Sequence, residues 1–176
     1  MTTDDAALAE RVRLLRNHGR RAKYVHDEIG FGERLDTLQA AVLAAKLPHL
    51  DEWTERRRAL AVRYTALLDS EVGGEIVTPA VHPAANPVWH LYVIRTARRD
   101  ALLEHLKRNG VEAGIHYPLP LHLQPAYAGL GYREGDLPVT EAVAATCLSL
   151  PLYPELSERD QDRVVALVRS FVACKA

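Results

Sequence analysis

Apolar residues in the first seventy positions recur at intervals of three and four, which is the period of an amphipathic helix. The first such helix begins after Asp4 or Asp5, either of which can cap it, and ends at Gly19, a residue suited to a helix C-terminus. Its apolar face consists of Leu8, Val12 and Leu15. The pattern therefore predicts a short helix at the start of the chain.

Residues 20–33 show no apolar periodicity and predict a long loop. A second helical pattern starts at Asp36, where Gln39 three residues later is typical of a capping box. Pro48 interrupts the pattern, so we expect a kink or break near residues 46–48 before a further helix. Such a break suits a domain boundary, which divides the chain into residues 1–47 and 48–176.

From residue 75 onward the pattern alternates between strand and helix. Helices are predicted from Asp100 to Gly110, from Pro138 to residue 145 and after Ser157. The predicted strands are residues 75–79, 88–96, 111–115 and 147–152. The alternation predicts a layered α/β or α+β domain.

Composition and charge exclude several classes of protein. A hydrophobic content of 48% with 26% charged residues is ordinary for a globular domain, and a net charge of −1 argues against nucleic-acid binding. No apolar run approaches the roughly 20 residues that a membrane-spanning helix needs. The arginine runs at residues 56–58 and 98–99 are balanced by nearby acids and are expected to face solvent.

The two cysteines have no metal-ligand spacing. Cys147 lies in an apolar run and is expected to be buried, whereas Cys174 lies near the end of the chain. Two unpaired thiols, with no secretory signal pattern at the start, indicate a cytoplasmic protein.

Residues 110–127 form the most unusual stretch, because they combine three prolines with two histidines and two tyrosines. Prolines stiffen a chain, and a stiff loop that carries polar rings is a typical place to bind a ligand. The alternative is a structural turn whose rings only pack. His116 and His122 have no third ligand nearby, which argues against a metal site, and no phosphate-binding or nucleophile motif is present.

Six stretches resemble one family of enzymes, in the same order along the chain. They are residues 13–19, 30–43, 46–47, 89–95, 114–122 and 148–154. Together they resemble the DegT/DnrJ/EryC1/StrS sugar aminotransferases, which are fold-type I enzymes that use pyridoxal phosphate. The resemblance covers only the C-terminal part of such an enzyme. It implies that residues 1–47 are the tail of the large cofactor domain, and that residues 48–176 are the linking helix and the small α/β domain.

The resemblance also implies that the catalytic lysine is absent. Family members carry the lysine that forms the Schiff base with the cofactor upstream of the position of Met1, and none of the four lysines here has that context. They are Lys23, Lys46, Lys107 and Lys175. The chain alone is therefore expected to be inactive and to need a lysine-bearing N-terminal portion, a second copy of itself and a nucleotide-linked keto-sugar as partners.

Particular positions carry family roles by resemblance. The family's Gly-x-Asn-x-Arg segment contacts the cofactor phosphate of the neighbouring subunit, and here Gly32 replaces the asparagine while Arg34 keeps its place. Gly32 offers only a backbone N–H, and a surface ion pair is the alternative role of Arg34. His116, Tyr117 and His122 resemble residues that line the nucleotide-sugar pocket.

Other positions and functions stay open at this point. His18 resembles a segment near the dimer interface but could simply end a helix, whereas Trp89 and Tyr92 are expected in the core. The chain could be a non-catalytic remnant or a dimerising half of a split enzyme, or a relative of the pyridoxal-phosphate-dependent sugar dehydratases. The apolar positions of residues 1–47 are expected to be exposed, and so to promote oligomerisation or poor solubility.

Overall fold

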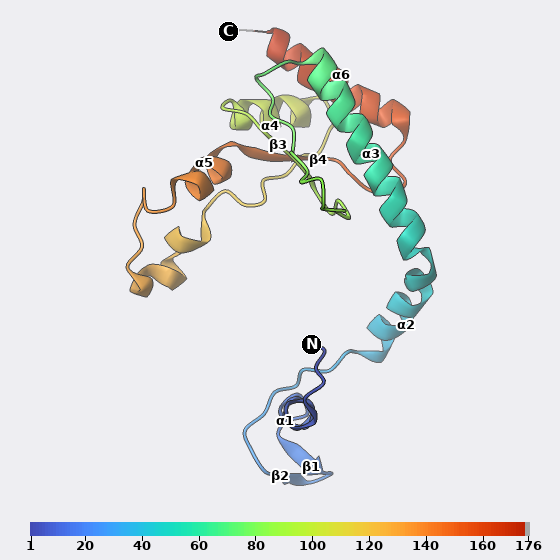
Figure 1. Ribbon diagram of the computed structural model, residues 1–176, viewed down its shortest axis with the longest axis vertical. Coiled ribbons are helices and arrows are strands. Elements are labelled where there is room, and N and C mark those ends of the chain that lie inside the picture. Colours follow the sequence, from blue (N-terminus) through green and yellow to red (C-terminus); the bar gives the residue numbers. More distant parts are fainter. Residues whose placement is uncertain (175–176) are drawn as a thin grey trace. The chain divides into compact units, whose positions relative to one another are not determined.

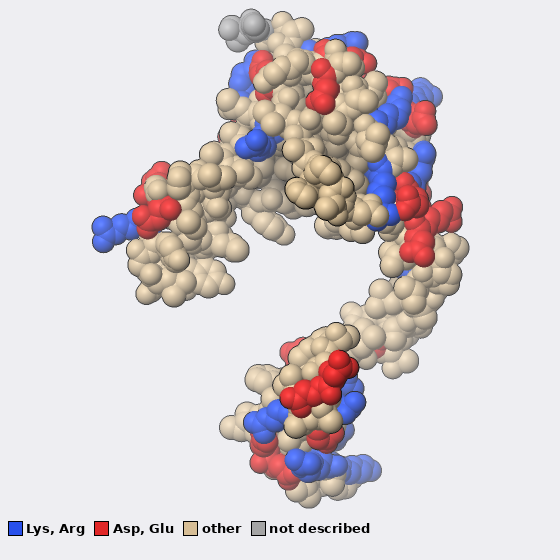
Figure 2. Space-filling model, viewed as in Figure 1, with Lys and Arg blue, Asp and Glu red and all other residues tan. Residues whose placement is uncertain are grey.

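The computed structural model describes residues 1–174, and the chain divides after Leu50 into two compact units (Figure 1). We call them the N-terminal unit and the C-terminal unit. Positive and negative side chains are interspersed over the visible surface of each, so neither shows a field of one sign (Figure 2). Within the described residues, no helix is both long enough and apolar enough to cross a membrane.

The N-terminal unit opens with α1 (Ala6–Leu15), whose N-cap is Asp5, as predicted. Its carboxylate accepts hydrogen bonds from the backbone N–H groups of Ala7 and Leu8. The predicted loop that follows is instead a small antiparallel hairpin of β1 (Arg20–Ala22) and β2 (Val25–His26). Both strands are largely exposed, so their sequence shows no alternation of apolar and polar residues, and the loop prediction was wrong there.

Two glycines allow the backbone after the hairpin to lie against the end of α1. A Cβ atom on Gly19, whose φ is +68°, would come 1.9 Å from the carbonyl oxygen of Glu28. A Cβ atom on Gly30 would come 2.2 Å from the backbone nitrogen of Gly19. The N–H of Phe31 then donates to the carbonyl of Leu15 over 2.7 Å, which satisfies one of the free carbonyls at the helix end.

Helix α2 (Thr37–Lys46) has Asp36 as its N-cap, and a 3-10 turn at Leu47–His49 separates it from the next helix. The predicted break at Pro48 is therefore confirmed. None of the α2 residues is buried. The expectation that the apolar positions of residues 1–47 are exposed is confirmed for Leu35 (63%), Leu38 (79%) and Val42 (58%), and for Leu8 of α1 (44%). It was wrong for Val12 and Leu15 of α1, which are half-buried.

The helices of the C-terminal unit are α3 (Leu50–Glu71), α4 (Arg99–Arg108), α5 (Pro138–Thr146) and α6 (Glu158–Ala173). Pro138 is in the first turn of α5 and Ser157 caps α6, as predicted. Asp100 does not cap α4: the N-cap is Arg98, and Asp100 lies in the first turn. The predicted N-cap of α4 was therefore right to within two residues, but the capping role given to Asp100 was wrong.

The sheet of this unit is antiparallel and small. Strand β3 (Tyr92–Arg95) pairs with β4 (Cys147–Leu150), and single bridges join Val77 to Arg95 and Gly114 to Ser149. Four segments therefore lie side by side in the order 77, β3, β4, 114. Of the strands predicted at residues 75–79 and 111–115, only the single bridges at Val77 and Gly114 are formed. The strand predicted from residue 88 starts only at Tyr92, after Trp89 adopts a φ of +51°.

One face of the sheet carries the core. Alternate residues of the two strands are buried on it, namely Tyr92, Ile94, Leu148 and Leu150. They pack with apolar residues of α3, α4 and α6 in a single cluster. The rings of Tyr64 and Tyr92 stack with centroids 5.0 Å apart, and Trp89 packs against the same cluster. The expected core positions of Trp89 and Tyr92 are confirmed.

The arginine runs do not simply face solvent. Arg57 donates to the carbonyls of Leu152 and Trp89 over 2.8 and 3.3 Å, which fastens α3 to the ends of both strands. Arg99 donates to the carbonyl of Ala144, and its side chain is only 11% exposed. The prediction of solvated arginines holds for Arg56, which is exposed, and was wrong for the other four, which are half-buried. Their long apolar stems can be buried while the guanidinium reaches backbone carbonyls.

Candidate functional site

The stiff loop leaves the edge of the sheet at Gly114 and places His116 over the neighbouring strand. Gly114 and Ser149 exchange two backbone hydrogen bonds of 3.1 and 2.7 Å. The Nδ1 atom of His116 lies 2.9 Å from the hydroxyl of Ser149, a side chain that is 4% exposed. The imidazole is thus fixed to a central strand rather than left on a mobile loop.

Gly114 is also a steric requirement of this arrangement. A Cβ atom there would lie 2.7 Å from Cε1 of His116, closer than two carbon atoms approach without a shift of one of them. The ring of His116 therefore occupies the space that any other residue at position 114 would fill.

Tyr117 extends the same site outward. Its ring is 74% exposed and meets the ring of His116 edge to face, with centroids 5.6 Å apart. Within residues 1–174 no hydrogen bond engages Nε2 of His116, which leaves one imidazole nitrogen and one phenol hydroxyl open to a ligand. Both groups donate and accept hydrogen bonds, which suits sugar hydroxyls and phosphate oxygens.

His122 lies in a different environment. It is 8% exposed, in the 3-10 turn Leu121–Leu123, and its Nε2 atom lies 2.9 Å from Oε1 of Glu141 on α5. The carboxylate of Glu141 also accepts hydrogen bonds from the N–H groups of Gly135 and Leu137. One carboxylate therefore ties the stiff loop, the glycine-rich turn and the first turn of α5 together.

These hydrogen bonds change the acidity of Glu141. The backbone N–H of Gly135, followed by His122 and the N–H of Leu137, holds the pKa of this carboxyl below its usual value of 4.5, and partial burial opposes the shift only in part. The carboxylate stays charged at neutral pH, and His122 serves to hold the loop in place.

The predicted cofactor residues Gly32 and Arg34 lie in the N-terminal unit. A Cβ atom on Gly32 would come 3.2 Å from Cε1 of His18, so the imidazole packs closely on this glycine. His18 has a φ of +60° and its N–H donates to the carbonyl of Phe31, which fits the helix-ending role. Arg34 is exposed, and among residues 1–174 its guanidinium has no ion pair.

Sequence reasoning did not single out Ser149, Gly114 or Glu141. Ser149 had a usable signal, because it is the one polar residue in the apolar run of residues 147–152. A lone hydroxyl in a buried strand needs a hydrogen-bond partner, and the partner is the imidazole of His116. Glu141 carried no comparable signal, since its three partners are assembled only by the fold.

Comparisons with known proteins identify the family of the chain. The model of the DegT/DnrJ/EryC1/StrS aminotransferase family matches residues 1–169. Among curated proteins, the chain is 50% identical over 170 residues to the erythromycin biosynthesis sensory transduction protein EryC1 of Saccharopolyspora erythraea, and these residues are 97% of this chain and 46% of that protein. It is 47% identical over 171 residues to the dTDP-3-amino-3,4,6-trideoxy-α-D-glucose transaminase of Streptomyces venezuelae, which covers 97% of this chain and 45% of the relative.

A solved structure shows the same fold. The crystal structure of S. venezuelae DesV in complex with a ketimine intermediate superimposes with a TM-score of 0.90 at 46% identity, over 99% of this chain and 47% of that one. The chain thus spans about half the length of the relatives that it matches. The mixed helix-and-strand fold expected of a fold-type I enzyme fragment is confirmed. The chain belongs to the DegT/DnrJ/EryC1/StrS aminotransferase family.

Proposed function

We propose that this chain supplies the nucleotide-sugar side of the active site of a pyridoxal-phosphate-dependent aminotransferase. The observation that carries the proposal is the fixed His116, held on Ser149 and next to the exposed Tyr117, in a member of an aminotransferase family. The reaction is the transfer of an amino group, from glutamate or glutamine, to a nucleotide-linked keto-sugar. The named activity of the Streptomyces venezuelae relative supports this substrate class.

His116 and Tyr117 bind and orient the substrate in this proposal. Nε2 of His116 and the hydroxyl of Tyr117 hydrogen-bond oxygen atoms of the sugar or its phosphate. The hydrogen bond to Ser149 fixes the imidazole of His116 before the substrate binds, so less conformational entropy is lost on binding. His122 contributes indirectly, because its contact with Glu141 positions the loop that bears both residues.

Gly32 and Arg34 fit the role of phosphate contacts to the cofactor. An exposed guanidinium without an ion pair among the described residues can pair with a phosphate, and the glycine allows the backbone N–H to approach closely. The cofactor, when bound, supplies the electron sink and carries the amino group. The lysine that a transaminase needs is proposed to lie on an N-terminal portion like that of the relatives.

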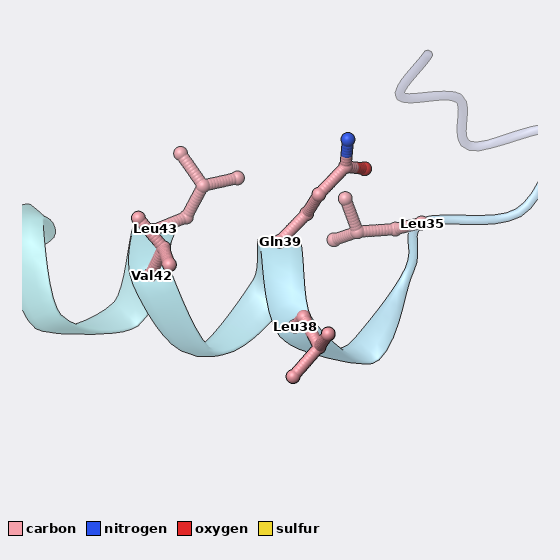
Figure 3. Close-up of a pocket in the computed structure, with 5 residues that line it drawn as sticks. All are labelled: Leu35, Leu38, Gln39, Val42 and Leu43. Carbon is pink, nitrogen blue, oxygen red and sulfur yellow. The ribbon is translucent and has the colours of Figure 1, made fainter.

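The exposed face of α2 supports the need for such a portion. Figure 3 shows the side chains of Leu35 and of four α2 residues projecting from the backbone. They border an open hollow of about 530 Å³. The hollow is lined by Leu35, Leu38, Gln39, Val42 and Leu43. We call these residues the α2 apolar face. An apolar surface of this kind is an association site, and we propose that the N-terminal portion and a second copy of the chain complete the assembly.

A chimera tests the proposal. The segment of the Streptomyces venezuelae transaminase that matches this chain is replaced by the 176 residues, and amino transfer from glutamate to its nucleotide keto-sugar is measured. The 47% identity and the shared fold make the exchange structurally matched. Activity is expected, together with a large loss on His116→Ala and little change in a matched His82→Ala control, since His82 is exposed and remote from the loop in sequence.

The outcomes separate the rival functions. A folded, cofactor-bearing chimera without amino transfer would indicate a non-catalytic remnant. Loss of water from the sugar in place of amino transfer would indicate a dehydratase. Equal activity of wild type and His116→Ala would remove His116 from the site.

A further inference from the structure

We infer that Arg95 is a second recognition residue of the same site and binds the diphosphate of the nucleotide sugar. This inference rests on the proposed function and deepens it. Arg95 is the last residue of β3 and is exposed.

The strand register places Arg95 beside His116. Val93 lies directly opposite Ser149, and Arg95 is two residues further along the same strand. Residues two apart on a strand point to the same face, so Arg95 and Ser149 are diagonal neighbours on that face. Such neighbours are about 7–8 Å apart, within reach of a long side chain. Because the imidazole of His116 is bonded to the Ser149 hydroxyl, the guanidinium can reach a ligand that His116 holds.

On this face of the sheet Val93 is half-buried and Arg95 is exposed in β3, whereas Ser149 and Cys147 of β4 are buried. Tyr92 and Ile94, which alternate with Val93 and Arg95, are fully buried in the core cluster on the opposite face. Val77, bridged to Arg95 at the edge of the sheet, is 43% exposed. A ligand bound at His116 can therefore reach the sheet edge at Arg95, where the surface is exposed.

The charge of Arg95 is not used within the chain. Two other arginines near the sheet have partners within the chain. Arg98 forms an ion pair with Glu75, and Arg99 forms one with Asp100 and donates to backbone carbonyls. Within residues 1–174, the guanidinium of Arg95 has neither an ion pair nor a hydrogen bond. A free planar guanidinium is suited to two oxygens of a phosphate group at once.

The diphosphate is the part of the substrate that this arrangement fits. His116 and Tyr117 offer hydrogen-bonding groups, which suit the sugar and its hydroxyls. Arg95, on the next strand, carries a guanidinium that is always protonated. The face then combines hydrogen-bond contacts for the sugar with a permanent cation for the phosphates.

Binding of dTDP to the 176-residue chain tests the inference. Isothermal titration at low ionic strength is expected to show binding by the wild type, and about tenfold weaker binding by Arg95→Gln, because a charge-assisted pair is lost. Arg95→Lys keeps the positive charge but not the planar set of N–H donors, and its affinity for dTDP is expected to lie between those of the wild type and Arg95→Gln. The control is Arg108→Gln, an exposed arginine on α4 with a single surface ion pair, which is expected to bind as wild type.

Thymidine, which lacks phosphate, is the second probe. The difference between wild type and Arg95→Gln is expected to vanish with thymidine. The inference is overturned if the wild type does not bind dTDP, if Arg95→Gln binds it as tightly as wild type, if Arg108→Gln loses as much, or if the loss persists with thymidine. Circular dichroism checks that each variant is folded.

The chimera distinguishes this inference from the proposed function. Arg95→Gln is expected to raise KM for the nucleotide sugar about tenfold and to leave KM for glutamate unchanged. An effect on glutamate alone would assign Arg95 to the donor carboxylate and overturn the diphosphate assignment. A chimera without amino transfer would defeat the proposed function, whereas the dTDP titrations would still decide whether Arg95 binds a diphosphate.

Discussion

Nδ1 of His116 and Oγ of Ser149 lie 2.9 Å apart, although 33 positions separate the two residues in sequence. Ser149 is part of a strand whose four residues are all buried, and its hydroxyl needs a partner there. The hydrogen bond therefore serves two purposes: it satisfies a buried hydroxyl and it fixes the imidazole that we assign to substrate binding.

Removal of this hydroxyl should release the ring of His116. Ser149→Ala is expected to lower the free energy of unfolding by about 1 kcal/mol, the usual contribution of one such hydrogen bond. Urea unfolding measures this value, and NMR of the imidazole reports ring mobility. Ser70→Ala, which removes an exposed hydroxyl on α3, is the control and should change neither. An unchanged imidazole spectrum in Ser149→Ala would show that the bond does not hold the ring.

A methyl group at position 114 should displace the same ring by steric contact. Gly114→Ala places a Cβ atom 2.7 Å from Cε1 of His116, and so is expected to break the contact with Ser149 and to impair substrate binding in the chimera. Gly129→Ala is the matched control, because a Cβ atom there meets nothing within 4 Å. Equal effects of the two substitutions would contradict the steric argument.

The hydrogen bonds made by the carboxylate of Glu141 should be lost at low pH. Its pKa is lower in the folded chain than the usual 4.5, mainly because of the N–H of Gly135, so the stabilisation is complete above the unfolded pKa and disappears as pH falls through the folded value. The protection of the amides of residues 120–137 against hydrogen exchange, relative to the intrinsic rate at each pH, is expected to fall below about pH 4. In Glu141→Gln this protection should already be low at neutral pH and should not change further in acid; a loss of protection in acid like that of the wild type would contradict this.

Two of the seven tyrosines should resist ionisation in alkali. Burial raises the pKa of Tyr92 to about 12, in opposition to a hydrogen bond from Thr65, and burial raises that of Tyr64 as well. Since the folded pKa exceeds the ordinary value of 10, the stabilisation is complete below pH 10 and is lost as pH rises toward 12. Absorbance at 295 nm during an alkaline titration should show these two rings titrating late, and Tyr92→Phe should remove one of them.

The α2 apolar face should drive association of the chain. Analytical ultracentrifugation is expected to show species larger than a monomer at high concentration, and Leu38→Gln should shift them toward the monomer, because its side chain is 79% exposed. Val139→Gln, at an equally exposed position on α5, is the control (77%). A wild-type chain that stays monomeric at high concentration would contradict the association.

The helices could be predicted because their signals are local. Asp5, Asp36 and Ser157 cap helices by bonds to N–H groups two or three residues away, so the sequence alone contains both partners. The strands could not be bounded in this way, since Gly114 becomes part of a sheet only through Ser149, a residue far along the chain.

The site was predicted in part for the same reason. The resemblance pointed to His116 and Tyr117, but nothing local indicated that His122 would be buried against Glu141. The arginines were misjudged because a guanidinium that bonds backbone carbonyls, as Arg57 does, looks in sequence like one that faces water.

The order of segments in the sheet has a consequence for biosynthesis. β4 is the last of the four segments to be made, yet it lies between β3 and the segment at Gly114, and two of its residues, Leu148 and Leu150, belong to the core. While a ribosome is still adding residues before Cys147, β3 and Gly114 have no strand to join them. The sheet of the C-terminal unit must therefore wait, unassembled, until β4 has been synthesised.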